Sequence, residues 1–382
     1  MKISDVKVIQ ARHYLFVKVY TDEGIAGLGE AGNWSYLAGT KATIESFIPY
    51  LIGKDPMKIE DINQNLYRAT HFRGSVIMSA ISAIDIALWD IKGKKLGVPV
   101  YELLGGLTRN KIRVYASPMS KEHDVDTLIK SYKDLKKQGF TAAKVFVNGP
   151  IASECDGRDE FFANKIELEV EKIRKIREAV GYDFDLILEA HRAMSLAEAI
   201  TFGKAVEKYR PYALEDPISP DNIDAMAQVA RQVPVNISTG ERFINLKEFQ
   251  MLLSREGATY VRPDACAVGG ITTAKKICAL AEAYNVQVIP HNPLGPVSTA
   301  TCLQIGACIP NLGIQELPEF CLDGAEDAMV LEPLKFKDGF MVIPTGNGIG
   351  IELADNIEEL FPAQGRGSTI AKRLYDGSVK DW

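Results

Sequence analysis

The spacing of hydrophobic residues changes near residue 112, and this change divides the chain into two predicted parts. Residues 2–10, 15–20 and 25–29 alternate between apolar and polar positions, which predicts three short strands joined by turns. Apolar residues then recur at three- and four-residue steps, which predicts helices at 40–51, 59–67 and 78–96. Strands followed by helices predict an α+β domain over residues 1–111.

From Ile112 onward, short apolar runs alternate with helical stretches. The runs predict strands at 113–117, 142–147, 185–190, 212–216, 235–240, 260–264, 287–291 and 313–317. Eight strands that alternate with helices match the strand count of a parallel α/β barrel, whose strands all end on one face. We therefore predict a barrel over residues 112–320. Residues 321–382 lose the alternation, contain a predicted hairpin at 334–343, and are expected to pack back on the first domain.

Length and composition agree with two globular domains and narrow the choice of partners. A chain of 382 residues is too long for one ordinary core, and its 46% apolar and 25% charged residues are typical of globular proteins. The net charge of −6 and the lack of a basic stripe argue against nucleic acid as a partner. We find no signal or transit pattern and no apolar run of about 18–20 residues, so we expect no membrane segment and a cytoplasmic location. The six cysteines lack zinc-site spacing, which favours buried thiols in a reducing compartment.

Three glutamates mark the ends of three successive predicted strands. Glu189, Glu215 and Glu241 are spaced 26 residues apart, each after a short apolar run. Because parallel barrel strands end on one face, the three carboxylates would converge there and repel one another unless a cation lay between them. Oxygen ligands alone favour a hard divalent ion, Mg²⁺ first. The spacing therefore predicts a magnesium site.

The next three predicted strands also end in ionisable residues. These are Asp264, His291 and Glu316. An Asp beside a His can accept one ring N–H and leave the other nitrogen as a base. A metal and a His base together suit removal of a proton α to a carboxylate, because the cation can stabilise the enediolate that results.

Several motifs carry a resemblance that extends over nearly the whole chain. They are Thr21-Asp22-Glu23-Gly24, Gly29-Glu30, the run 83–93, Leu103-Leu104-Gly105-Gly106, Thr239-Gly240-Glu241-Arg242, Pro263-Asp264, Gly269-Gly270 and His291-Asn292-Pro293. With them the chain resembles the mandelate racemase branch of the enolase superfamily, and within it the acid-sugar dehydratases of the galactonate and gluconate dehydratase type. The resemblance implies an α+β capping domain, completed by the C-terminal tail, over a modified TIM barrel of the (β/α)7β form.

The resemblance also implies roles for the strand-end residues. One Mg²⁺ per subunit would be held by Glu189, Glu215 and Glu241, although relatives often carry Asp at the position of Glu189. His291 and Asp264 would form the base dyad. Glu316 would be an acid near the substrate carboxylate. A homo-oligomer, with an octamer as one form, is implied in the same way.

Two positions favour dehydration within this superfamily. Racemases commonly carry two lysines on the second barrel strand, and this chain has Lys144-Val145-Phe146, so the second Lys is absent. His191 stands two residues after Glu189, so strand alternation predicts that both face the same side. Galactonate-type dehydratases have a His at the matching place, where it is thought to protonate the departing hydroxyl.

We therefore predict Mg²⁺-dependent dehydration of an aldonic acid, galactonate or gluconate first, to a 2-keto-3-deoxy acid through an enediolate. The alternatives are an epimerase or racemase of a 2-hydroxy acid, and a non-catalytic paralogue that binds an acid sugar. His191 has its own alternative, a hydrogen-bonded residue without a role in proton transfer.

Candidate substrate-binding residues come from the barrel and from the cap. Lys144 is predicted to contact the substrate carboxylate, with a structural strand-end Lys as the alternative. His71, Arg73 and Trp34 stand in predicted loops of the first domain, where they could reach the distal hydroxyls of the sugar acid. The alternative for these loop residues is an ordinary surface position.

Overall fold

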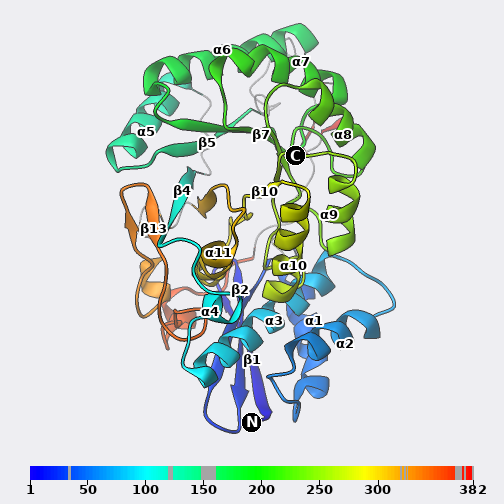
Figure 1. Ribbon diagram of the computed structural model, residues 1–382, viewed down its shortest axis with the longest axis vertical. Coiled ribbons are helices and arrows are strands. Elements are labelled where there is room, and N and C mark those ends of the chain that lie inside the picture. Colours follow the sequence, from blue (N-terminus) through cyan, green and yellow to red (C-terminus); the bar gives the residue numbers. More distant parts are fainter. Residues whose placement is uncertain are drawn as a thin grey trace.

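The computed structural model describes residues 1–32, 36–118, 124–147, 161–318, 321, 324, 326–365, 372–373 and 376–380. The chain begins with an antiparallel sheet and four helices, which we call the cap (Figure 1). The sheet has the order β1 (Ile3–Ala11), β2 (Tyr14–Thr21), β3 (Ala26–Ala31). The helices are α1 (Leu37–Leu51), α2 (Ile59–Ala69), α3 (Ser75–Leu96) and α4 (Val100–Leu103). The elements predicted for the cap are therefore confirmed.

Helix α3 is the centre of the cap because it is buried on nearly every side. It packs closely on β3, where a side-chain carbon added at Gly29 would collide with the backbone oxygen of Ala83. The helix ends at Gly97, whose φ of 70° gives the left-handed C-terminal cap that glycine adopts without strain. The predicted helix at residues 78–96 is therefore a core helix rather than a surface helix.

The second part is a closed parallel barrel. Its strands are β4 (Lys111–Ser117), β5 (Ala142–Phe146), β6 (Asp185–Glu189), β7 (Ala213–Glu215), β8 (Ile237–Thr239), β9 (Tyr260–Val261), β10 (Gln287–Val288) and β11 (Gln315–Pro318). Neighbours pair in parallel from β4 to β10, a bridge joins Val288 to Leu312, and β11 returns to β4. All eight strands lie where the sequence predicts them.

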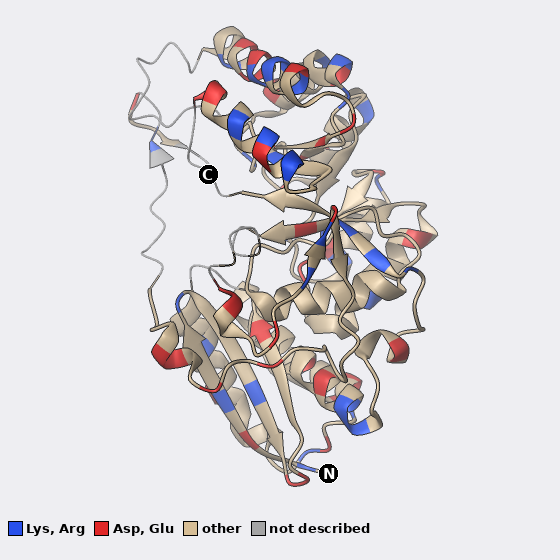
Figure 2. Ribbon diagram, turned by 90° about the vertical axis from the view of Figure 1, so that its left-hand side faces the viewer, with Lys and Arg blue, Asp and Glu red and all other residues tan. Residues whose placement is uncertain are grey.

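Helices follow the first seven of these strands and cover the barrel from outside. They are α5 (Val125–Lys137), α6 (Phe162–Val180), α7 (Leu196–Val206), α8 (Ile223–Gln232), α9 (Leu246–Leu253), α10 (Gly270–Ala283) and α11 (Pro296–Cys308). With β11 as the last strand, the described elements give the predicted (β/α)7β order. Lys, Arg, Asp and Glu alternate on the outer helices, α5 and α6 among them (Figure 2), which is usual for helix faces turned to water.

The C-terminal tail contacts both parts of the molecule. The predicted hairpin is confirmed as β12 (Phe336–Lys337) and β13 (Phe340–Val342), and β13 pairs antiparallel with the start of β4, so this hairpin extends the barrel sheet. Farther on, α13 (Ile357–Leu360) packs against β1 in the cap, and Glu358 accepts a hydrogen bond from Lys7 at 2.8 Å. The tail thus joins the cap to the barrel instead of packing on the cap alone.

Two sequence-based expectations about composition can be compared with the structure. Across the described ranges, no helix has both the length and the apolar character required to cross a membrane. The described cysteines are not joined in disulfides, and four of them, Cys266, Cys278, Cys302 and Cys308, are buried. Cys155 lies outside the described residues.

Candidate active site

Strand alternation explains how the barrel brings its ionisable residues together. A layer of buried side chains fills the barrel interior: Tyr115, Ala142, Ile187, Ala213, Tyr260, Ile289 and Ile314. Every second residue of an extended chain faces the same side, so the residue two positions after each of these also faces inward, nearer the C-terminal ends of the strands. Those positions hold Ser117, Lys144, Glu189, Glu215, Arg262, His291 and Glu316. A polar layer therefore lies directly above the apolar one.

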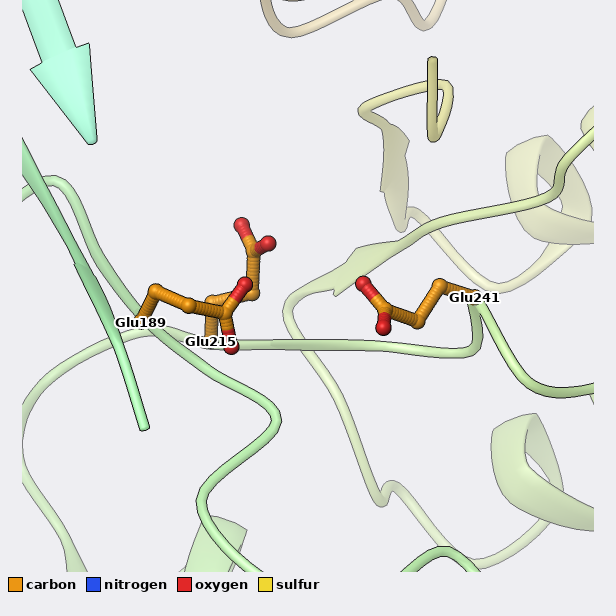
Figure 3. Close-up of side chains that lie close together, drawn as sticks. All are labelled: Glu189, Glu215 and Glu241. Carbon is orange, nitrogen blue, oxygen red and sulfur yellow. The ribbon is translucent and has the colours of Figure 1, made fainter. Parts of the chain in front are cut away.

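Glu189 and Glu215 of this polar layer form a triad with Glu241, which follows β8. One carboxylate oxygen from each lies within 4.8 Å of the others. Glu189 and Glu215 are paired in register at the ends of β6 and β7, and Glu241 reaches toward them from the opposite side (Figure 3). Gly240 has a φ of 122°, so the chain turns just before Glu241 in a conformation that favours glycine.

The three carboxylates differ in their electrostatics. Burial raises the pKa of Glu189 well above its usual range, and the neighbouring Glu215 raises it further. Burial opposes ionisation of Glu215 too, but Arg262 and Lys144 lower its pKa. The pKa values of two carboxylates that share a site move apart in this way, because the two groups cannot both ionise freely.

The donor set fits a divalent cation. Oε1 of Glu215 faces Lys144 and Arg262, whereas Oε2, among the described residues, is buried without a hydrogen-bond partner. Among the described residues, the cluster holds more carboxylates than cations, and its carboxylates are Glu189, Glu215, Glu241, Glu316, Asp216 and Asp264. The cations facing them are Lys144, Arg242 and Arg262. Carboxylate oxygens at this spacing are the ligands that Mg²⁺ takes in proteins.

Lys144 lies deep among the carboxylates. Its Nζ is 2.7 Å from Glu215, 2.9 Å from Glu316 and 3.1 Å from Glu189, and only 5% of the side chain is exposed. Burial opposes its charge, but the carboxylates raise the pKa of Lys144 well above its usual range. The structure therefore brings this predicted residue into the cluster as a buried counter-charge.

Arg262 is a member of the site that sequence reasoning missed. It is completely buried, with Nη2 2.7 Å from Glu316 and 3.1 Å from Glu215. Its Nη1 donates to the hydroxyl of Tyr115 at 2.8 Å. The signal was present in the sequence, because Arg262 stands two residues after the inward-facing Tyr260.

Glu316 is held as an ionised acceptor. Besides Lys144 and Arg262, it accepts hydrogen bonds from Ser117 Oγ at 2.8 Å and from the backbone N–H of Asn292 at 3.0 Å. Burial opposes ionisation, yet Lys144 and Arg262 lower the pKa of Glu316 well below its usual range. Ser117 is a second contributor that sequence reasoning missed. The arrangement favours an acceptor at this position rather than a proton donor.

His291 and Asp264 lie as an oriented pair. Nδ1 of His291 is 2.8 Å from Oδ2 of Asp264, whose Oδ1 accepts the N–H of Cys266 at 2.7 Å. Nε2 of His291 faces the triad, 3.5 Å from Glu241. Burial lowers the proton affinity of the ring, but Glu241 and Asp264 outweigh it and raise the pKa of His291. In a neutral ring whose Nδ1–H bonds Asp264, Nε2 is the nitrogen left to act as a base.

His191 reaches the cluster by a different route from the one predicted. Strand alternation does not extend to this residue, because β6 ends at Glu189 and His191 and Arg192 have left-handed φ values of 49° and 60°. This turn lets the N–H of His191 donate to Oε1 of Glu189 at 2.6 Å. Nε2 of His191 lies 3.0 Å from Arg242, and a guanidinium only donates, so Nε2 accepts.

Arg242 connects His191 to the triad. Its Nη1 is 2.8 Å from Oε1 of Glu241 and also pairs with Asp216. His291 faces the other oxygen of Glu241, Oε2. One triad carboxylate is therefore linked to both imidazoles, directly to His291 and through Arg242 to His191.

The cap candidates are not part of this cluster. His71 and Arg73 are exposed in the turn between α2 and α3, where the Arg73 guanidinium lies 5.3 Å from the centre of the Tyr67 ring. In the described part of the chain, neither makes a hydrogen bond or ion pair with the triad. Trp34 lies outside the described residues.

Comparison with known families follows the two parts of the fold. The model of the mandelate racemase / muconate lactonizing enzyme N-terminal domain matches residues 2–105. The enolase C-terminal domain-like model matches residues 127–357. Together these models cover the cap and the barrel.

Named relatives and solved structures agree with this match. The chain is 36% identical over 380 residues to a D-galactonate dehydratase of Ralstonia nicotianae, covering 97% of this chain and 96% of that protein. It is 36% identical over 393 aligned positions to a D-galactonate dehydratase of Pectobacterium atrosepticum, covering both chains fully at 100%. An enolase from Agrobacterium radiobacter, solved with bound Na and L-malate, superposes with a TM-score of 0.91 at 29% identity, with 100% of each chain covered. A member of the enolase superfamily from Salmonella Typhimurium superposes with a TM-score of 0.88 at 31% identity, covering 94% of this chain and 98% of that one.

Proposed function

This chain belongs to the mandelate racemase / muconate lactonizing enzyme family of the enolase superfamily, and we propose that it is a hydro-lyase that dehydrates an aldonic acid to a 2-keto-3-deoxy acid. One observation carries the proposal: two imidazoles lie at one carboxylate of the triad, His291 facing Oε2 of Glu241 directly and His191 connected to Oε1 through Arg242. Removal of a proton from one carbon and departure of a hydroxyl from the next need two such groups. Named relatives at 36% identity support the same reaction class.

The triad of Glu189, Glu215 and Glu241 is our proposed site for one Mg²⁺ per subunit. When bound, the cation supplies the positive charge that stabilises the substrate carboxylate and the enediolate derived from it. Glu189 stands where relatives often carry Asp, and its longer side chain still reaches the other two carboxylates. Lys144 and Arg262 hold Glu215 from the other side and keep its second oxygen turned to the site.

His291 is the proposed base. Its Nε2 takes the proton from C2 of the bound acid, while Asp264 fixes the ring and stabilises the imidazolium that forms. The electron pair left at C2 moves into the carboxylate to give the enediolate.

His191 is the proposed acid. It gives a proton to the hydroxyl on C3, which departs as water while the enediolate electrons form the C2–C3 double bond. The resulting enol takes up a proton at C3 and loses the proton of its C2 hydroxyl, which gives the 2-keto-3-deoxy acid. Arg242 holds the ring of His191 beside the triad while the ring is neutral. The imidazolium that delivers the proton has a hydrogen on both nitrogens, so this contact opens when His191 is protonated.

Substrate identity and assembly are further predictions. Galactonate and gluconate are the favoured substrates, with Lys144 near the carboxylate and His71, Arg73 and Trp34 near the distal hydroxyls. The domain boundaries at residues 111 and 320, the homo-oligomer and the cytoplasmic location also stay predictions.

Incubation with a library of aldonates in D₂O and Mg²⁺ tests the proposal. A dehydratase yields a 2-keto acid that reacts with semicarbazide. A racemase or epimerase, the alternative within the family, would instead return the substrate inverted and deuterated at C2. If no aldonate gives either product, a non-catalytic paralogue that binds an acid sugar is favoured.

A further inference from the structure

Both residues of the base dyad lie in loops that lead directly into barrel helices. Asp264 precedes α10, and His291 precedes α11. The first amides of a helix have no partner within the helix and need acceptors from elsewhere. The N-terminal cap positions are Gly269 and Gly295, and neither has a side chain that could supply one.

For α11 the acceptor comes from the cap. Glu30, at the end of β3, accepts the N–H of Gly295 at 2.6 Å with Oε1 and the N–H of Ser298 at 2.8 Å with Oε2. Glu30 is completely buried. A side-chain carbon added at Gly295 would lie 2.8 Å from Oε1 of Glu30, so the glycine leaves the space that this carboxylate fills.

For α10 the acceptor also comes from the cap. Asp85, in the middle of α3, accepts the N–H of Thr272 at 3.0 Å and the side-chain amide of Asn63 at 2.8 Å. Asp85 fills the space that a side chain at Gly270 would need, because a carbon added there would collide with its carboxylate. One turn earlier on the same helix, Ser82 Oγ accepts the N–H of Gly269 at 2.8 Å.

The loop that carries His291 is short and is held at both of its ends. On the barrel side, the N–H of Asn292 donates to Glu316 at 3.0 Å, and the N–H of His291 donates to the backbone oxygen of Pro263 at 3.2 Å. On the cap side, Glu30 holds Gly295. Because only residues 292–294 lie between His291 and Gly295, a shift of the α11 terminus would reach the imidazole directly.

We propose that Glu30 and Asp85 are positioning residues for the base dyad, so that the seating of the cap on α10 and α11 sets the geometry of His291 and Asp264. The cap then contributes to proton removal through the position of the dyad. This inference rests on the proposed function for the role of His291 as a base. Burial raises the pKa of Glu30 to about 8 and that of Asp85 to about 7, and such costly buried acids agree with a specific task.

The variant Glu30→Gln tests the inference with little change in size. A Gln side chain accepts with one oxygen only, and its NH₂ would face the second N–H of the α11 terminus. We expect the rate of C2 hydrogen exchange in D₂O, per folded molecule, to fall at least about tenfold, because small misplacements of catalytic groups cost this much or more. The Kd for Mg²⁺ should change less than about twofold, since Glu30 contacts none of the triad.

Asp90→Asn is the matched control. Asp90 is a buried carboxylate on the same helix as Asp85, but it accepts the N–H groups of Leu28 in the cap and Ile349 in the tail, each at 2.8 Å. Its loss should lower the stability of the cap without moving the dyad. Equal losses of exchange in Glu30→Gln and Asp90→Asn, after correction for the folded fraction, would show a purely structural role and overturn the inference.

A second measurement needs no substrate. The proton on Nδ1 of His291, hydrogen-bonded to Asp264, should give a downfield NMR signal in the metal-free protein, assigned by its absence in His291→Asn. We expect this signal to shift or disappear in Glu30→Gln and Asp85→Asn and to stay in place in Asp90→Asn. An unchanged signal in Glu30→Gln would overturn the inference. If the wild-type protein neither exchanges the C2 hydrogen of any aldonate nor dehydrates one, the proposed function fails. The NMR signal of the Nδ1 proton still decides the role of Glu30.

Discussion

Replacement of Lys144 by Met removes a buried positive charge of the site without much change in side-chain volume. The ammonium group lies 2.7–3.1 Å from three carboxylates, those of Glu215, Glu316 and Glu189. With an effective dielectric constant of about 20, each such contact has a gross Coulomb energy of roughly 6 kcal/mol. Desolvation of the buried ions offsets most of this energy. Loss of one partner of a buried ion pair costs about 3–5 kcal/mol, and this is the loss of unfolding free energy that we expect for Lys144→Met in the presence of a chelator.

Mg²⁺ should restore part of the lost unfolding free energy, because the bound cation and the ammonium group of Lys144 both neutralise Glu189 and Glu215. A ligand at 100 times its Kd stabilises the folded state by about 2.7 kcal/mol, and the variant should gain more than the wild-type protein at equal Mg²⁺. Urea titrations with chelator and with Mg²⁺ measure both quantities. Lys130→Met, on the exposed face of α5, is the control and should cost less than about 1 kcal/mol.

Two results would refute this reasoning. A loss below about 1 kcal/mol for Lys144→Met in chelator would mean that the buried carboxylates do not depend on the ammonium. An equal gain from Mg²⁺ in the variant and the wild-type protein would mean that the cation binds away from Glu189 and Glu215.

Three further predictions concern the base, the metal and pH. His291→Asn should abolish C2 hydrogen exchange, followed by NMR in D₂O, and retained exchange would remove His291 from the role of base. Glu215→Gln should weaken Mg²⁺ binding at least about tenfold by calorimetry, because the site loses a charged ligand; an unchanged Kd would place the cation elsewhere. Burial raises the pKa of Asp85 to about 7, so the folded protein holds a proton there that the unfolded chain releases near pH 4. The resulting stability is complete below pH about 4 and is lost as pH rises to about 7, by at most about 1.4 kcal/mol per unit. Asp85→Asn should lack this decline in urea titrations at pH 5 and 7.5, and an identical decline would contradict the assignment.

The barrel and its main ionisable residues could be predicted because local patterns encode them. An apolar run that ends in Glu189 or Glu215 reports both the strand and the face on which the carboxylate lies. The parallel order of the strands then brings these ends together without any further information. The same strand alternation predicts that Arg262 faces inward, two residues after Tyr260. An arginine between Val261 and Pro263 is nevertheless not expected to be buried from its sequence neighbours alone.

Features that depend on turns or on distant contacts could not be predicted in this way. His191 reaches the cluster through a left-handed turn of non-glycine residues, which no local rule indicates. Glu30 and Asp85 read as ordinary acids of a strand end and a helix, and only the docked barrel helices show what they hold. The pairing of β13 with β4 joins segments more than 200 residues apart in the chain and has no local signal.

The two-histidine mechanism is tested most directly in the variant His191→Asn, by comparing the rate of C2 hydrogen exchange with the rate of dehydration. With Mg²⁺ and an aldonate that the wild-type protein dehydrates, the variant is incubated in D₂O, and NMR follows both deuterium at C2 and the 2-keto-3-deoxy product. We predict that C2 exchange by His291 persists while dehydration falls by a factor of about 100 or more, the contribution of a general acid. Loss of both reactions together, or dehydration at the wild-type rate, would contradict the assignment of separate base and acid roles to His291 and His191.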